Sequence, residues 1–206
     1  MRTKLIKGLA VTLVVVLSGL TAGCGEFIRS DRAAVTVVIT ELVAGEGANP
    51  QAFAGTLRSD VCRLRNNRCT IFDDMARVTM TLVLKDRGIP SITNVPSPTN
   101  TVTINRYRVT FRRSDGRNTA GVDVPFPFES ALTFTVPAEG VVSGTFELIR
   151  HTSKVEPPLG ALTGSLVVIS TIADVTFFGR DQAGNNVSTT GSLGVLFGDF
   201  ADPVGS

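Results

Sequence analysis

The sequence of 206 residues predicts an all-β protein, an antiparallel β-sandwich of about seven to nine strands that follows an N-terminal signal peptide. Short segments in which apolar and polar residues alternate recur at regular spacing, as in strands with one buried face. The many Val, Thr and Phe residues favour strands over helices. The 20 Gly and 10 Pro separate these segments as turns.

The first 23 residues have the layout of a secretory signal peptide. Arg2, Lys4 and Lys7 form a basic head, an apolar run extends from Leu9 to Leu20, and small residues follow it. The apolar run of about a dozen residues is shorter than the roughly 20 that a transmembrane helix needs. We therefore expect residues 1–23 to be removed on export.

The end of this signal, Leu20-Thr21-Ala22-Gly23-Cys24, resembles the lipobox of bacterial lipoproteins. In that family the Cys is acylated and becomes the first mature residue, so the resemblance implies membrane attachment through a lipid anchor at Cys24. Thr21 stands where the family most often has Leu. Gly25 in place of Asp implies the outer membrane if the cell is Gram-negative. The resemblance therefore implies a cell-envelope location, with plain secretion after the same cut as the alternative.

The mature chain is expected to be one domain on a short tether. Residues 1–23 hold three basic and no acidic side chains, so 20 basic and 18 acidic become 17 and 18, a net charge of −1. A nucleic-acid partner would require a retained basic excess, so none is expected. We expect a tether at residues 24–32, a sandwich domain at 33–202 and a tail at 203–206.

With Cys24 acylated, Cys62 and Cys69 remain as a pair in an oxidising compartment, and we expect them to form a disulfide. A zinc site would need closer cysteines and further Cys or His ligands, and the chain has one histidine, so no metal is expected. If the two cysteines lie directly opposite each other in a hairpin, its turn centres on Arg65-Asn66.

Two strands are expected in the first half of the domain. Residues 34–43 are apolar on both faces, which predicts an inner strand, and residues 78–84 alternate as a half-buried strand. The Gly-rich residues 45–59 predict a long loop with one helical turn near Asn49. Three prolines predict that residues 89–100 form an unpaired loop.

The strand predicted at residues 101–113 changes phase. Val102 and Ile104 share one parity, whereas Tyr107 and the apolar residues after it need the other, so we expect a β-bulge near Asn105-Arg106. Beyond the bulge, three arginines then point outward, and we name them the arginine row: Arg106, Arg108 and Arg112.

The arginine row is the candidate binding surface. Guanidinium groups suit bidentate contacts to carboxylate or phosphate, so an acidic polysaccharide, a lipid headgroup or an envelope protein is a candidate partner. The alternative, which we favour, is cross-strand pairing with acidic residues. Acidic neighbours would make the row structural, and Thr, Ser or Asn neighbours would leave it an open anion-binding surface.

The second half of the domain predicts strands at residues 132–136 and 142–154, a central strand at 166–178 and a final hairpin strand at 187–197. The turn sequence Asp181-Gln182-Ala183-Gly184-Asn185 resembles the last hairpin of bacterial immunoglobulin-like domains, which implies an Ig-like sandwich. The chain departs from that family in lacking a Cys…Trp…Cys core and in exceeding its ~100 residues.

Other candidate sites have weaker signals. His151, the only histidine, is expected at a strand end, and no nucleophile elbow, zincin pair or phosphate loop accompanies it, so we expect no enzyme activity. Five side chains with oxygen ligands could bind calcium, although Asp and Asn are also ordinary turn residues, the interpretation that we favour. These are Asp181, Asn185, Asn186, Asp199 and Asp202.

Together these features predict a lipid-anchored cell-envelope protein whose sandwich has a structural or binding role and no cofactor. A carrier of an apolar ligand is the first alternative and would need a large internal cavity. A hydrolase of envelope polymers is the second, and would need a cleft with two close carboxylates.

Overall fold

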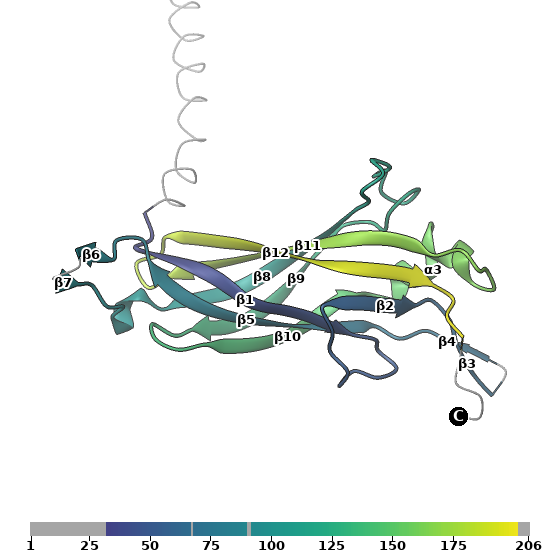
Figure 1. The fold of residues 1–206 in the computed structure, drawn as a ribbon, viewed down its shortest axis with the longest axis horizontal. Helices are drawn as coiled ribbons and strands as arrows, with labels where there is room; N and C mark the ends of the chain where they lie inside the picture. The colour runs from purple at the N-terminus through teal and green to yellow at the C-terminus, as the bar shows by residue number, and fades with distance from the viewer. Residues whose placement is uncertain (1–31, 67, 90–91, 202–206) are drawn as a thin grey trace, which may run out of the picture.

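The computed structural model describes residues 32–66, 68–89 and 92–201, which form a β-sandwich (Figure 1). The predicted signal peptide, Cys24 and nearly all of the tether lie outside the described residues, as does the tail. In the described part of the chain, no helix is both long and apolar enough to cross a membrane.

Two sheets make up the sandwich, and their strands confirm the predicted all-β fold. The three-stranded sheet has the order β1-β5-β10, and all of its pairs are antiparallel. Its strands are β1 (Val35–Gly45), β5 (Asp74–Leu84) and β10 (Val142–Ile149). The five-stranded sheet has the order β2-β12-β11-β8-β9, in which only β2 and β12 run parallel. Its strands are β2 (Thr56–Asp60), β8 (Val102–Arg112), β9 (Phe128–Val136), β11 (Ile169–Asp181) and β12 (Asn186–Gly198).

Short elements lie at the two ends of the sandwich. In Figure 1, the hairpin β3–β4 and helix α3 lie at the right end, and β6–β7 lies at the left end with the start of β1. Their bounds are β3 (Arg63–Arg65), β4 (Arg68–Thr70), β6 (Gly88–Ile89), β7 (Ile92–Thr93), α3 (His151–Val155) and the 3-10 helices η1 (Pro98–Asn100) and η2 (Leu159–Leu162). The start of β1 therefore lies at the end of the sandwich opposite α3.

Alternating side chains of both sheets fill the space between them. In β5 the buried positions are Ala76, Val78, Met80 and Leu82, as the predicted alternation requires. Three aromatic rings join the sheets, with ring centroids 4.9 Å apart for Tyr107–Phe146 and 5.2 Å apart for Phe146–Phe177. The Tyr107 hydroxyl donates a hydrogen bond to the Glu147 carbonyl at 2.8 Å, so its polar atom is satisfied inside the core.

The predicted bulge in β8 is confirmed. Ile104 lies opposite Gly179 of β11 and Arg106 lies opposite Phe178, so Asn105 is the extra residue in the strand. A Cβ atom at Gly179 would lie 2.5 Å from the Thr103 carbonyl oxygen, which explains the glycine at this close approach. Beyond the bulge, the side chains of Tyr107, Val109 and Phe111 are buried, as predicted.

Four predicted elements are wrong. Residues 89–100 were expected to be an unpaired loop, but Ile89 of β6 pairs with Ile92 of β7 in a short hairpin, and η1 follows, since Pro blocks only its own backbone N–H. Residues 34–43 form an edge strand, not an inner one, and Val38 is 37% exposed. The prediction failed because β-branched residues favour a strand whether or not they are buried. Residues 56–60 form β2 rather than a loop, and the buried Ser59 and Asp60 hide its apolar pattern. The strand predicted to reach residue 154 ends at Ile149, and α3 follows it.

The central strand and the final hairpin are confirmed. β11 is the middle strand of the five-stranded sheet, and it pairs with β12 from Ile169 to Arg180, all but the last of its residues. Gly184 in the connecting turn has a φ of 81°, in the left-handed region that favours glycine.

Candidate functional site

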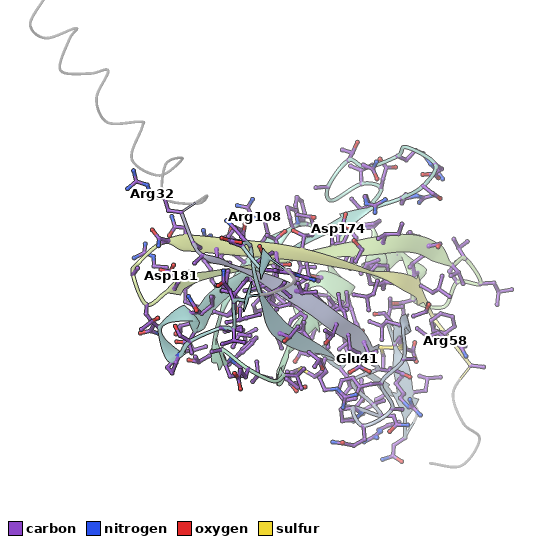
Figure 2. All side chains as sticks on the ribbon, turned by 60° about the vertical axis from the view of Figure 1, so that its left-hand side comes forward. Arg32, Glu41, Arg58, Arg108, Asp174 and Asp181 are labelled. Atoms are coloured by element: carbon purple, nitrogen blue, oxygen red, sulfur yellow. A yellow bond between two sulfur atoms is a disulfide. The ribbon has the colours of Figure 1, made fainter. Side chains whose placement is uncertain are left out.

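The outer face of the five-stranded sheet carries the arginine row. The side chains of Arg106, Arg108 and Arg112 are 49%, 52% and 50% exposed, so all three point outward from β8 as expected. Figure 2 shows Arg108 and Asp174 on this side of the molecule. The bulge produces this placement, because without it the arginines would have the parity of the core residues.

Acidic residues from both neighbouring strands pair with the row. Glu129 of β9 accepts a hydrogen bond from Arg106 Nη1 at 2.7 Å and one from Arg108 Nε at 2.6 Å. The hydrogen bonds from Arg108 and then Arg106 hold the pKa of Glu129 below its usual value. Arg112 Nε donates to Asp174 Oδ2 of β11 at 2.6 Å. Because its neighbours are acidic, the arginine row has a structural role and is not an unpaired anion-binding surface.

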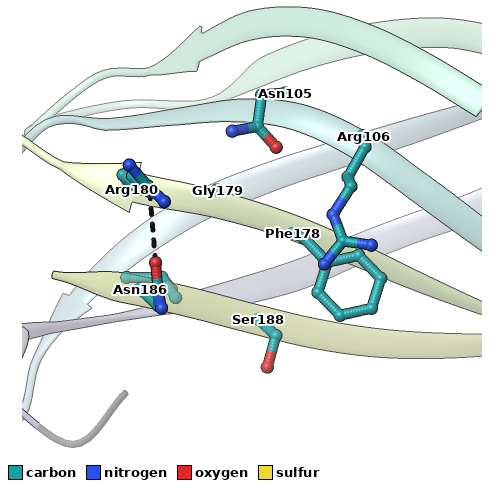
Figure 3. A pocket seen from close by; sticks show the side chains of 8 residues that line it. Asn105, Arg106, Phe178, Gly179, Arg180, Asn186 and Ser188 are labelled. Atoms are coloured by element: carbon teal, nitrogen blue, oxygen red, sulfur yellow. Dashed lines mark hydrogen bonds between the residues drawn. The ribbon is translucent and has the colours of Figure 1, made fainter. Parts of the chain in front are cut away.

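A surface depression lies where the bulge interrupts β8. It has a volume of about 270 Å³ and is lined by Asn105, Arg106, Phe178, Gly179, Arg180, Asn186, Val187 and Ser188. We name it the bulge depression; Figure 3 shows Arg106 and Arg180 on opposite sides of it. The Arg106 guanidinium lies over the Phe178 ring, 4.0 Å from its centroid.

Arg180 differs from the arginine row in its partners. Its Nε donates to the amide oxygen of Asn186 at 3.2 Å. Among the described residues, no carboxylate forms an ion pair with Arg180. This site was not predicted from the sequence, although the outward-facing Phe178, next to Gly179 and opposite a predicted bulge, is a signal that could have indicated it.

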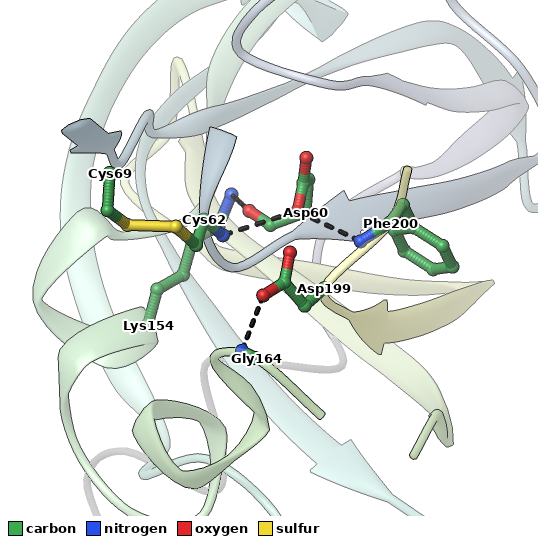
Figure 4. Close-up of a disulfide and its surroundings, with 7 residues drawn as sticks. All are labelled: Asp60, Cys62, Cys69, Lys154, Gly164, Asp199 and Phe200. Atoms are coloured by element: carbon green, nitrogen blue, oxygen red, sulfur yellow. Dashed lines mark hydrogen bonds between the residues drawn. A yellow bond between two sulfur atoms is a disulfide. The ribbon is translucent and has the colours of Figure 1, made fainter. Parts of the chain in front are cut away.

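The four described residues of the candidate calcium set do not lie together. Asp181 accepts hydrogen bonds from the backbone N–H and the side-chain amide of Asn185, both at 2.8 Å, which is the turn arrangement that we favoured. Asp199 lies at the other end of the long strand β12 and accepts from the Gly164 N–H (Figure 4). Asp202 lies outside the described residues, within which no group of three candidate metal ligands occurs.

The structure contains the Cys62–Cys69 disulfide, with a Cα–Cα separation of 5.2 Å (Figure 4). This separation lies within the range typical of disulfides. The expected register is wrong, however, because Leu64 rather than Cys62 lies opposite Cys69. The hairpin therefore turns one residue later than expected, and Asn66 takes a φ of 51°, a left-handed conformation that Asn tolerates.

A buried ion pair at the α3 end is the clearest polar site that the sequence did not reveal. Lys154 Nζ lies 2.9 Å from Asp74 Oδ2, and their side chains are 1% and 0% exposed. Ser59 Oγ and the Gly47 N–H also donate to Asp74, and Lys154 donates to the Asp60 carbonyl. Burial raises the pKa of Asp74 against the lowering effect of Lys154 and Ser59. Among the described residues, the contacts of this pair are all with groups inside the protein, so the pair secures α3 to the sandwich.

The neighbouring Asp73 and His151 form an exposed counterpart to this pair. Asp73 Oδ1 accepts from the His151 N–H at 2.6 Å and lies 2.9 Å from Nδ1 of its ring. Burial and the hydrogen-bonded Asp73 raise the pKa of Glu147. Burial also raises the pKa of Asp73, but the hydrogen bonds from His151 and Glu147 outweigh it and the net shift is downward. His151 is the first residue of α3, so the expectation that it lies at the end of a strand is wrong.

Comparisons of the chain with protein-family models, with curated proteins and with solved structures gave no match. Its likeness to lipoprotein signals and to Ig-like hairpins therefore stands on the quoted residues alone.

Proposed function

We propose that this protein is a lipid-anchored component of the cell envelope whose β-sandwich binds a partner without catalysis. The observation that carries the binding role is the outer face of the five-stranded sheet, where the bulge depression joins two arginines, two amides and an aromatic ring. The lipobox-like Cys24 supports the anchor, and β1 begins at Val35, eleven residues beyond it.

Two features support a binding module over a carrier of apolar ligands. Core side chains from both sheets contact each other, as the Tyr107–Phe146–Phe177 cluster illustrates. The bulge depression lies outside this core and is lined mainly by polar residues. A carrier would need an apolar cavity between the sheets, where these rings pack.

The anchor is tested by Cys24→Ser in the native host. We expect the variant to leave the membrane fraction and to lose incorporation of labelled palmitate, because the acylated thiol is gone. The Cys62→Ser/Cys69→Ser double variant is the matched control, since it removes two cysteines and should keep the label. A Cys24→Ser chain that still sediments with membranes at the same yield would contradict the proposal.

A second candidate function is hydrolysis of envelope polymers, and the Asp73–Glu147 pair favours it. Neighbouring carboxyls with pKa values shifted in opposite directions can act as general base and general acid. Asp73 is exposed beside His151 and Glu147 is half-buried, and neither carboxyl lines the bulge depression. Release of reducing ends from cell-wall polymer by the full chain, abolished by Glu147→Gln, would favour this function over binding.

A further inference from the structure

We propose that the bulge depression binds the carboxylate of an acidic sugar in an envelope polysaccharide, with Arg106 and Arg180 as its two cationic contacts. This inference deepens the proposed function and rests on it for the role of the outer sheet face.

The backbone creates the depression. Asn105 is inserted in β8 opposite the step from Phe178 to Gly179, so the strands lose their regular pairing there. Gly179 contributes no side chain to fill the gap, since the Thr103 carbonyl leaves no room for a Cβ atom. Bulges are frequent beside functional sites, where they redirect side chains. Here the bulge directs Arg106 toward Phe178.

Arg106 and Arg180 differ in the contacts that hold them, and both keep N–H groups that could bind an anion. Arg106 is held by the Phe178 ring and by one Nη1 hydrogen bond to Glu129, and among residues 32–66, 68–89 and 92–201 its other N–H groups have no hydrogen-bond partner. Within the part of the chain that the structure describes, Arg180 has one side-chain hydrogen bond, from Nε to Asn186. Glu129 is also shared with Arg108, so the negative charge beside the depression is already divided between two cations. A bound carboxylate would add a second negative charge beside these cations and could accept two parallel N–H hydrogen bonds from one guanidinium group.

The remaining lining residues favour a sugar over a lipid headgroup. Asn105, Asn186 and Ser188 offer amide and hydroxyl groups that match sugar hydroxyls. A membrane-binding site would instead combine basic residues with exposed Trp, Phe or Leu side chains. Asp181, the last residue of β11, and Arg32 lie at the same end of the domain in Figure 2, so the depression lies toward the end where β1 starts. A polysaccharide close to the membrane would be within reach of this end.

The experiment measures binding of the purified full-length chain to polygalacturonate, with neutral dextran and anionic lipid vesicles as comparison probes. We expect binding to polygalacturonate alone, weakened by about tenfold in Arg180→Ser, because each hydrogen bond to a charged group contributes a tenfold factor or more. Arg58→Ser is the matched control. Arg58 lies on the same sheet face and stacks on Phe200 at 4.4 Å, outside the depression.

Three results would overturn the inference. These are equal affinity of Arg180→Ser and Arg58→Ser, binding to dextran as strong as to polygalacturonate, or binding to vesicles in place of the polysaccharide. Unchanged melting temperatures show that both variants are folded. The assay does not depend on acylation, so a failure of the Cys24 anchor and a failure of this site give separate results.

Discussion

The buried pair Lys154–Asp74 and the exposed pair Arg112–Asp174 use similar chemistry in opposite surroundings. Each joins a cation to an aspartate within 3 Å, at 2.9 Å and 2.6 Å. The first pair is hidden from water, whereas the Arg112 side chain is 50% exposed. A short distance therefore does not by itself measure how much an ion pair stabilises the fold.

Solvent explains the difference. When an exposed partner is removed, water takes its place, and such pairs contribute about 0–1 kcal/mol. When a buried partner is removed, the other charge stays in a medium that solvates it poorly, which costs about 3–5 kcal/mol. Lys154 and Asp74 also connect α3, β5 and the end of β2, so several elements depend on them.

The largest expected effect is that of Lys154→Met. The variant leaves the Asp74 carboxylate buried without its cation, so we expect the free energy of unfolding to fall by about 3–5 kcal/mol. Urea denaturation of the full chain measures it. In Lys154→Met/Asp74→Leu, which removes both charges, most of the loss should be recovered. A loss below 1 kcal/mol in the single variant would mean that the pair behaves like an exposed one.

Removal of the disulfide tests the same end of the domain. We expect Cys62→Ala/Cys69→Ala to lower the free energy of unfolding by about 2.5 kcal/mol, because the unfolded chain regains the freedom of a short loop. Urea denaturation with and without reductant checks this value. Reductant should change the native protein and leave the double variant unaffected. An equal response of both proteins would argue against a native Cys62–Cys69 bond.

The dependence of stability on acid pH tests the contribution of Asp174, the aspartate of the exposed pair. Burial raises the pKa of Asp174, but the hydrogen bonds from Arg112 and Ser192 outweigh it and the net shift is downward. A lowered folded pKa adds stability above the unfolded value, near pH 4, and this stability is lost as the pH falls through the folded value. Asp174→Asn should therefore lose less stability than the native chain when acidified below about pH 4. Identical acid profiles would contradict this sign.

The smallest expected effect is that of Arg112→Ser. Because the side chain is half-exposed, we expect a loss of about 0–1 kcal/mol, decreasing further at high salt. Thermal unfolding at low and high ionic strength measures it against Lys154→Met, whose effect should hardly depend on salt. A salt-independent loss of several kcal/mol in Arg112→Ser would end the contrast between the two regions.

Sequence reasoning succeeded where the signal is local. The alternation in β5, the phase change at Asn105 and the turn at Gly184 are each contained within a few residues, and the structure has all three. Even so, the turn of the hairpin between Cys62 and Cys69 lies one residue later than expected, since the left-handed residue Asn66 sets the register of the two strands. Locally encoded features are thus predictable in kind and less so in register.

By itself, the sequence determined the all-β class, the bulge and the outward direction of the arginine row, because backbone periodicity and turn chemistry act between near neighbours. Only the tertiary structure decided which partners the arginines have, that residues 151–155 form a helix, and where a depression opens. Glu129 and Arg106 are 23 residues apart, and Lys154 and Asp60 are 94 apart. Pairings at such separations follow from the packing of two sheets, which no local pattern contains.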